Sequence, residues 1–396
     1  MAKGLFLIFP AHGHINPTIG LVKELISKGD EITYISSEKF RSKIENVGAK
    51  FNGFKESYSA NMINRNQLGT MTENFLDSYT TLLETALREN DEFDYLVVDP
   101  FIRPGKRILE KLKIKKVITN STTFAINKHV FSSVSESIKK DIEFSKKVEV
   151  DFKRMKPRYE KLSEKFQIEF PKNLAEIIVG FKADLTLVYT SKYYQPFSED
   201  FSDSFKFVGP SIFDRKELTD FKIENPDNKK IIFISLGTIG NNNLKFYKEC
   251  FKALGSRDDL EVLMSIGNKI KVEELGEAPK NFKIYNYVPQ LEVLKQTDIF
   301  ITHGGMNSSS EGLYNGIPLI VVPQFGDQPI VARRVEELGA GIALFKNINK
   351  KSISESVNKI LANSSYKENA RKISKSLKEC GGYKKAAEYI HNSLNN

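Results

Sequence analysis

The sequence contains no tryptophan and only two cysteines, Cys250 and Cys380, among its 396 residues. Two cysteines are too few for a disulfide framework, and neither has a neighbour at metal-ligand spacing, so we expect a protein of the reducing cytoplasm. No apolar run approaches the roughly 20 residues that a membrane-spanning helix needs. The first ten residues lack the pattern of a signal peptide and look like a strand. These absences predict a cytoplasmic protein that is not inserted in a membrane.

Three nucleotide-binding signatures are absent as well. No G-x-G-x-x-G follows a predicted strand, which disfavours a dinucleotide oxidoreductase, and the lack of G-x-x-x-x-G-K-[ST] excludes a P-loop NTPase. The sequence also contains no D-x-D, so we do not expect a sugar nucleotide to be held through a metal ion. We predict neither a bound metal nor a cofactor.

The chain carries 59 Lys and Arg against 50 Asp and Glu, which gives a net charge of +9. An excess of this size is compatible with a polyanionic partner such as nucleic acid. However, the cations are mostly lysines spread along predicted helices beside acidic residues, without the clustered arginines and interleaved aromatics of a nucleic-acid interface. We therefore expect no nucleic-acid partner.

Short apolar runs alternate with helical patterns along most of the chain, which predicts an α/β protein with buried parallel strands. The length is about twice that of a common single domain, so we expect two doubly wound domains. Strands are predicted at 4–10, 31–36, 95–98 and 116–119 in the first half, and at 231–236, 260–266, 282–287, 298–302, 318–322 and 341–344 in the second.

Turn-rich sequence divides the chain near its middle. The predicted parts are a first domain at 1–210, a linker at 211–228, a second domain at 229–380, and a C-terminal helix at 381–396 that packs back on the first domain. Polar helical segments near 55–90 and 135–170 extend the first domain. Segments of this kind often carry variable binding functions.

A first candidate site combines His14 and Asp99. Each follows a predicted strand, and ligands of open α/β sheets gather beyond the carboxyl ends of the strands. A histidine beside a carboxylate can act as a general base whose imidazolium is stabilised as it forms. The helix that follows His14 is predicted to begin with Asn16 as its N-cap and Pro17 at its first position, and to end at Gly29.

Two other interpretations of this motif remain open at the level of sequence. His14 can simply cap the following helix, and Asp99 can start a turn before Pro100. Alternatively, His12 and His14 form the H-x-H that opens metal-dependent hydrolases on a (β/α) barrel. A catalytic zinc site needs three protein ligands. The remaining candidates are few: His129, His303 and His391.

A second candidate site follows the predicted strand at 298–302. Its residues are His303, Gly304, Gly305, Met306, Asn307, Ser308 and, one helical turn later, Glu311. Glycines let the backbone approach a ligand, and the free N–H groups of a helix start bind phosphate oxygens. A carboxylate such as Glu311 suits the two hydroxyls of a ribose, although Glu311 can also serve as a capping-box residue.

Two more loops follow strands of the same predicted sheet. Gly237 and Thr238 form a glycine turn that can approach the same phosphates. Asp327 and Gln328 offer the acceptors and the donor that sugar hydroxyls require, or they are an ordinary polar helix start.

Taken together, these motifs make the sequence resemble the GT-B-fold UDP-glycosyltransferases, most closely the bacterial macrolide and flavonoid glycosyltransferase group. Four segments carry the resemblance in the expected order and span nearly the whole chain. They are Pro-Ala-His-Gly-His-Ile-Asn-Pro at 10–17, Ser-Leu-Gly-Thr at 235–238, Tyr-Val-Pro-Gln-Leu at 287–291, and 303–328. The resemblance implies two Rossmann-like domains that face each other across a cleft.

The resemblance also implies a role for each candidate residue. His14 corresponds to the general base and Asp99 to its partner. The pyrophosphate positions are His303, Gly304, Gly305, Met306, Asn307 and Ser308, with Gly237 and Thr238 closing the site. The remaining donor positions are Glu311 for the ribose, Asp327 and Gln328 for the sugar ring, and Val288 (backbone) and Gln290 for the uracil. Tyr287 stands where many relatives have a tryptophan that stacks on the base, so an aromatic face is retained.

The reaction implied is inverting, metal-independent transfer of a hexose from a UDP-sugar co-substrate to a hydroxyl of a hydrophobic small molecule. Glucose is expected because Gln328 occupies the position that favours it in relatives. The acceptor is expected in the first domain, bordered by segments near 55–80 and 120–150. A UDP-sugar epimerase or hydrolase on the same fold is the alternative, and it would form product without any acceptor.

Overall fold

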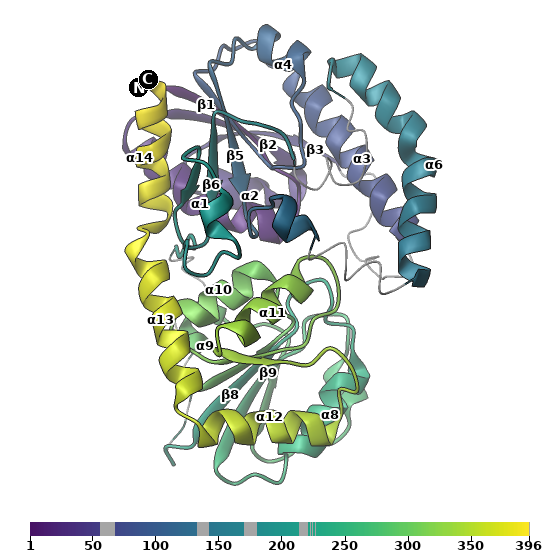
Figure 1. Cartoon of the computed structure of the whole chain (residues 1–396), viewed down its shortest axis with the longest axis vertical. Helices are drawn as coiled ribbons and strands as arrows, with labels where there is room; N and C mark the ends of the chain where they lie inside the picture. The colour runs from purple at the N-terminus through teal and green to yellow at the C-terminus, as the bar shows by residue number, and fades with distance from the viewer. Residues whose placement is uncertain are drawn as a thin grey trace. The chain divides into compact units, whose positions relative to one another are not determined.

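The computed structural model describes residues 1–55, 68–132, 142–169, 180–213, 221, 223, 225 and 227–395. These residues form two compact units, Met1–Phe213 with Cys380–Asn396, and Asp214–Glu379. Each unit is built around one parallel sheet with helices beside it (Figure 1). The predicted α/β class with two doubly wound domains is confirmed.

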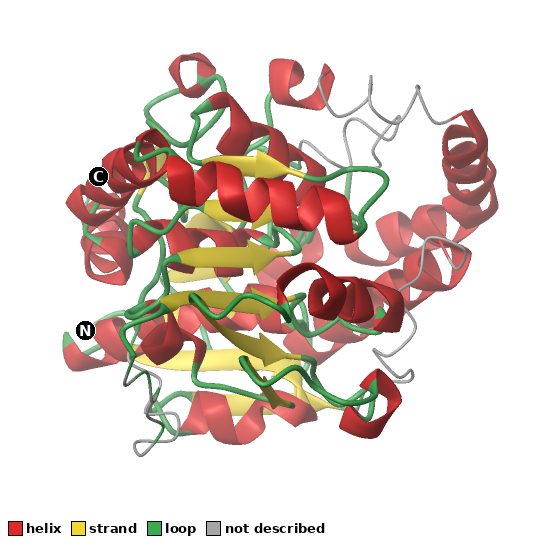
Figure 2. Cartoon of the chain, turned by 90° about the horizontal axis from the view of Figure 1, so that it is seen from below, coloured by secondary structure: helices red, strands yellow, loops and turns green. Residues whose placement is uncertain are grey.

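The first sheet has seven strands in the order β3-β2-β1-β4-β5-β6-β7. All of its pairings are parallel, and in Figure 2 the strand arrows within a sheet point the same way. Its strands are β1 (Lys3–Leu7), β2 (Glu31–Ser37), β3 (Lys50–Phe54), β4 (Tyr95–Val98), β5 (Lys116–Ser121), β6 (Leu185–Val188) and β7 (Phe205–Phe207). The carboxyl ends of these strands share one edge, which is where ligands of such sheets bind.

The helices of this unit are α1 (His12–Ser27), α2 (Arg41–Glu45), α3 (Leu68–Ala86), α4 (Lys106–Lys111), α6 (Ile142–Phe166) and α14 (Gly382–Leu394), with short 3-10 turns η1 (Glu38–Phe40) and η3 (Ser198–Asp200). The polar segments predicted to be helical correspond to α3 and α6. Residues 56–67, 135–141 and 170 of these segments lie outside the described residues.

The second sheet has six strands in the order β10-β9-β8-β11-β12-β13, again all parallel. Its strands are β8 (Lys230–Ser235), β9 (Leu260–Ser265), β10 (Phe282–Tyr285), β11 (Ile299–Thr302), β12 (Leu319–Val321) and β13 (Gly341–Ala343). The helices around it are α8 (Leu244–Leu254), α9 (Gln290–Leu294), α10 (Met306–Tyr314), α11 (Gln328–Glu337), α12 (Lys350–Ala362) and α13 (Ser365–Glu379), with the 3-10 turn η4 (Val272–Leu275).

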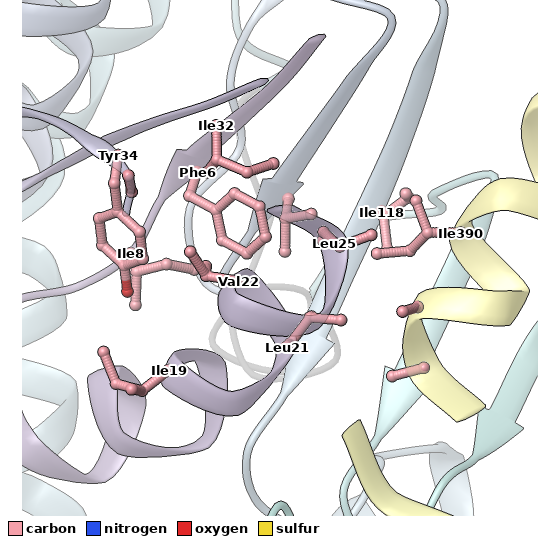
Figure 3. Packing of buried hydrophobic residues seen from close by; sticks show 14 of the residues in the cluster. Phe6, Ile8, Ile19, Leu21, Val22, Leu25, Ile32, Tyr34, Ile118 and Ile390 are labelled. Atoms are coloured by element: carbon pink, nitrogen blue, oxygen red, sulfur yellow. The ribbon is translucent and has the colours of Figure 1, made fainter. Parts of the chain in front are cut away.

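Helix α14 brings the C-terminal residues of the chain onto the first sheet. Ile390 is fully buried with Phe6 of β1 and Leu25 of α1 in one apolar core (Figure 3). A Cβ on Gly20 of α1 would lie 2.9 Å from the ring of Tyr383, so a glycine is what lets the two helices approach. Burial of an aliphatic side chain such as Ile390 contributes about 1.5–3 kcal/mol.

The start of α1 differs from the prediction. The helix begins at His12 with Ala11 as its N-cap, five residues before the predicted N-cap Asn16. Pro17 therefore lies inside the helix, where it removes a single backbone donor and its fixed φ is compatible with the helical conformation. The predicted end is confirmed, since Gly29 has φ +98° and its N–H donates to the carbonyl of Ile26.

The sequence does not predict three strands of the first sheet. β3 contains an Asn-Gly pair that is typical of a turn, and β7 has only three half-buried residues. β6 is four residues long. None of the helices among the described residues is long and apolar enough to cross a bilayer.

Candidate active site

His14 and Asp99 meet at the carboxyl edge of the first sheet. His14 lies in the first turn of α1, and Asp99 directly follows β4, the neighbour of β1. The Nδ1 of His14 is 2.8 Å from the Oδ1 of Asp99, whose side chain is fully buried. The other carboxylate oxygen accepts a hydrogen bond from the backbone N–H of Phe9 at 2.5 Å. Asp99 is thus fixed from two sides.

This geometry defines the chemistry available to His14. When Nδ1–H donates to a carboxylate, the Nε2 atom carries the lone pair of the neutral ring and can accept a proton. His14 keeps 24% of its side chain exposed, so a small molecule can reach it. The interpretation of His14 as a helix cap is wrong, because the N-cap is Ala11 and no side chain caps α1.

The alternative of a barrel metal hydrolase is also wrong, because the described chain forms two open sheets and no barrel. His12 packs against Phe40, with ring centroids 5.1 Å apart at an angle of 78°. Within the described part of the chain, no group of three or more His, Cys, Asp or Glu side chains is placed to hold a metal ion.

A small cavity borders His14 within the first unit. Phe101 and Phe124 give it aromatic walls, while the hydroxyl-bearing residues Thr119 and Thr122 at the end of β5 give it polar ones. Such a mixture suits an apolar molecule that also carries hydroxyl groups.

The second unit holds the predicted phosphate site, and its centre is the ring of His303. A Cβ added to Gly237 would lie 2.6 Å from this ring, and a Cβ on Gly305 would lie 2.4 Å from it. The imidazole therefore packs between two glycine backbones that tolerate no side chain. Gly237 and Gly304 also have φ values of +72° and +84°, which favour glycine. Burial lowers the pKa of His303 to about 4, so the ring is neutral at pH 7 and donates through one nitrogen.

Helix α10 begins beside this ring. Its N-cap is Gly305, no side chain caps it, and its first turn contains no acidic residue. Met306 is buried, while Asn307 and Ser308 are half-buried in that turn. The start of a helix with this composition attracts an anion through its N–H groups and dipole.

One turn further along α10, the buried Glu311 is bonded to Gln290 at the start of α9. The Nε2 of Gln290 donates to Oε2 of Glu311 at 2.6 Å and lies 3.4 Å from the Oγ of Ser308. Glu311 is not a capping-box residue, because the N-cap of α10 is Gly305 and the capping-box position three residues later is Ser308. Two separate segments thus bring together three residues that are predicted to bind the sugar nucleotide, Gln290, Ser308 and Glu311.

The other predicted donor-site residues lie on the neighbouring loops. Tyr287 has 55% of its surface exposed and offers an accessible aromatic face, while the adjacent Val288 is buried. Thr238 is exposed beside Gly237.

Asp327 and Gln328 occupy the N-terminal end of α11, with Asp327 as the N-cap. Gln328 is buried, and its Oε1 accepts hydrogen bonds from the backbone N–H groups of Gln324 and Phe325 at 2.8 and 3.1 Å. It therefore shapes the loop at 323–327. The sequence does not indicate this role, because it depends on the path of the loop.

Two further features of the first site do not follow from the sequence prediction, the backbone N–H of Phe9 and the polar run Asn120 to Thr123 at the end of β5. The rule that singles out Asp99, a polar residue directly after a buried strand, applies to this run as well. The sequence prediction ends this strand at Thr119 and therefore does not identify the run, whereas β5 continues to Ser121.

Comparison with known proteins identifies the family. A family model described as UDP-glucoronosyl and UDP-glucosyl transferase matches residues 215–379. The uncharacterized UDP-glucosyltransferase YojK of Bacillus subtilis is 37% identical, with 98% of this chain and 97% of the relative covered. The NDP-glycosyltransferase YjiC of Bacillus licheniformis is 34% identical, with 96% and 95% covered.

Solved structures agree with this result. The glycosyltransferase of kitacinnamycin superposes with a TM-score of 0.80 at 27% identity, and 99% of each chain is covered. The calicheamicin glycosyltransferase CalG4 gives a TM-score of 0.80 at 26% identity, with 100% of this chain and 99% of the other covered. The chain therefore belongs to the UDP-glycosyltransferase family and is an enzyme with the GT-B fold.

Proposed function

We propose that this enzyme transfers glucose from UDP-glucose to a hydroxyl group of a hydrophobic small molecule, with inversion at the anomeric carbon and without a metal ion. The observation that carries the proposal is the 2.8 Å contact between His14 and the buried Asp99. A general base fixed in this way suits a single-step displacement, because only the proton of the acceptor hydroxyl has to be removed during the attack.

In the proposed reaction, Nε2 of His14 takes the proton of the acceptor hydroxyl as its oxygen attacks the anomeric carbon. The bond between that carbon and the diphosphate oxygen breaks, and UDP leaves with the electron pair. Asp99 keeps its own hydrogen bond to Nδ1–H and stabilises the imidazolium without accepting the proton.

The second unit is proposed to bind the donor. The first turn of α10, His303 and Ser308 stabilise the charge that develops on the leaving diphosphate, and the backbone of Gly237 and Thr238 closes this site. Since His303 is neutral at pH 7, it contributes a hydrogen bond and no positive charge.

The nucleoside and the sugar are assigned to neighbouring positions. Glu311, held by Gln290, accepts hydrogen bonds from the ribose hydroxyls, and Tyr287 stacks on the uracil beside the backbone of Val288. The sugar ring binds at Asp327 and Gln328, where α11 begins.

The first unit is proposed to bind the acceptor against the exposed part of His14, where a small cavity with aromatic and hydroxyl-bearing walls borders the ring. We assign the acceptor-binding domain to residues 1–210 together with the C-terminal helix 381–396. The linker is then 211–228, and the domain that binds the UDP-sugar is 229–380. The names of relatives support the substrate classes: YojK is named as an uncharacterized UDP-glucosyltransferase, and another relative is the oleandomycin glycosyltransferase of Streptomyces antibioticus.

The test is incubation with UDP-glucose and a panel of phenols, flavonoids and macrolides in the presence of EDTA. We expect a product heavier than an acceptor by one hexose, formed together with an equal amount of UDP. Consumption of UDP-glucose at the same rate with no acceptor would contradict the proposal and favour a UDP-sugar hydrolase or epimerase. Loss of activity on chelation would contradict the metal-independent mechanism.

A further inference from the structure

The edge of the first sheet that carries His14 and Asp99 also holds buried polar atoms that make no hydrogen bond with any described residue. They include Nδ2 and Oδ1 of Asn120 and the hydroxyl oxygens of Tyr189, Thr190 and Ser211. Buried polar groups are nearly always paired in proteins, so such a cluster beside a reactive pair calls for an explanation.

Asn120 is the neighbour of Asp99 across the sheet. Val98 of β4 pairs with Thr119 of β5, so the next step of the same register sets Asp99 opposite Asn120. Asn120 is fully buried, and neither its amide nitrogen nor its amide oxygen has a hydrogen-bond partner among the described residues. An amide N–H group therefore lies next to a buried carboxylate.

Tyr189 lies one strand further along the same edge. It follows β6, and its backbone N–H donates to the carbonyl of Ser121 at 3.1 Å. Its side chain is buried in the apolar core between the sheet and α1, the same face on which α1 presents His14. Burial, and then the charge of Asp99, raise the pKa of Tyr189, so its hydroxyl stays protonated and remains a donor.

The carboxylate of Asp99 has room for further donors. An ionised carboxylate offers about four lone pairs. One oxygen receives the hydrogen bond from His14 and the other receives that from the N–H of Phe9. The unpaired donors of Asn120 and Tyr189 thus adjoin a buried anion that can accept more hydrogen bonds than these two.

We propose that Asn120 and Tyr189 are positioning residues for the transfer reaction, whose side-chain donors each reach the carboxylate of Asp99 through a bound water. In this arrangement the carboxylate stays aimed at His14 while that residue carries the proton of the acceptor. The role in catalysis rests on the proposed function, whereas the effect on the His14–Asp99 pair does not.

The groups around Asp99 determine whether the pKa of His14 rises or falls when a hydrogen-bond donor is removed. Among the described residues, Asp99 interacts electrostatically with the titratable side chains of His14 from α1, Tyr34 from β2 and Tyr189 after β6. The hydroxyl of Tyr34 is already paired with that of Thr18 at 2.7 Å, which leaves Tyr189 as the tyrosine that can serve Asp99. A carboxylate that loses a donor presents more of its charge to the imidazole, so the pKa of His14 rises.

The direct test is an NMR titration of the protein with isotopically labelled histidine. The chain has five histidines, and the His14→Gln variant assigns the signal of interest. We expect Tyr189→Phe and Asn120→Leu each to raise the pKa of His14 by about 0.5–1 unit, a fraction of the roughly 1–2 units that one hydrogen bond to a charged group is worth, because the lost donor acts on His14 only through Asp99. The control is Tyr247→Phe, which removes an equally buried and unpaired hydroxyl from α8 of the other unit and leaves the pKa of His14 unchanged.

The inference is overturned if the pKa of His14 is the same in the wild type, in Tyr189→Phe and in Asn120→Leu, even where the variants are less stable to heat. If Asn120→Leu does not fold, Tyr189→Phe alone tests the inference, because this variant removes only one unpaired hydroxyl group. In turnover, the acid limb of kcat/KM for an aliphatic alcohol acceptor moves to higher pH by the same amount. If the variants show the NMR shifts but the wild type transfers no sugar, the proposed function is contradicted and this inference stands.

Discussion

The packing of His303 between two glycine backbones predicts how the donor site can be disabled without unfolding the protein. Gly305 has φ −60°, a conformation that alanine adopts freely, yet its Cβ would lie 2.4 Å from the ring of His303. Gly305→Ala therefore displaces the ring at little backbone cost. If His303 and the start of α10 bind the diphosphate, the lost contact to a charged group weakens UDP binding by about 1.5–3 kcal/mol, or roughly 10- to 100-fold.

Two other glycine variants separate the steric effect from the backbone effect. Gly276 has φ +85°, and no atom beyond the adjacent residues lies within 4 Å of the position that a Cβ would take. Gly276→Ala should therefore cost about 1–3 kcal/mol of stability and leave UDP affinity unchanged. Gly237→Ala combines a positive φ with a Cβ 2.6 Å from His303, so both stability and UDP affinity should fall. Isothermal titration with UDP and chemical denaturation measure the two effects. Wild-type affinity for UDP in Gly305→Ala would refute the placement of the diphosphate beside His303.

The other parts of the site and fold give three further predictions. Glu311→Gln should weaken UDP binding roughly 10-fold by calorimetry while binding of free diphosphate is unchanged, since the ribose loses an ionised acceptor. The lowered pKa of His303 means that the unfolded chain binds a proton between about pH 6.5 and 4 where the folded chain does not, so stability falls as the pH decreases through this window. Urea denaturation should show a smaller fall in His303→Gln, and an identical fall would contradict this. Breaking the exposed Glu84–Lys165 pair between α3 and α6 by Glu84→Gln should cost less than about 1 kcal/mol and nothing in high salt; a larger cost would contradict this.

The sequence is most informative where a strand is buried and ends in chemically distinctive residues. Asp99 and His303 follow buried strands directly, while His14 and Glu311 lie in the helices that come after β1 and β11, and His14 meets Asp99 there. The six strands of the second sheet are predicted correctly because each is an apolar run bounded by turn residues.

Elements that depend on tertiary contacts are harder to predict. β3 resembles a turn because of its Asn-Gly pair, and it forms a strand because β2 offers it a parallel edge. Helix α1 continues through Pro17 although the proline lacks a backbone donor, and no local pattern predicts this. The position of Asn120 beside Asp99 requires the register of β4 and β5, which no local pattern reveals.

The central claim, that His14 removes the proton of the acceptor, is tested most directly by comparing His14→Ala with His12→Ala in transfer to an aliphatic alcohol. His12 lies two residues away and packs against Phe40, so its variant controls for damage to the start of α1. We predict that His14→Ala slows transfer by about 10²–10⁴-fold, while His12→Ala stays near the wild-type rate. Wild-type turnover in His14→Ala would contradict the mechanism.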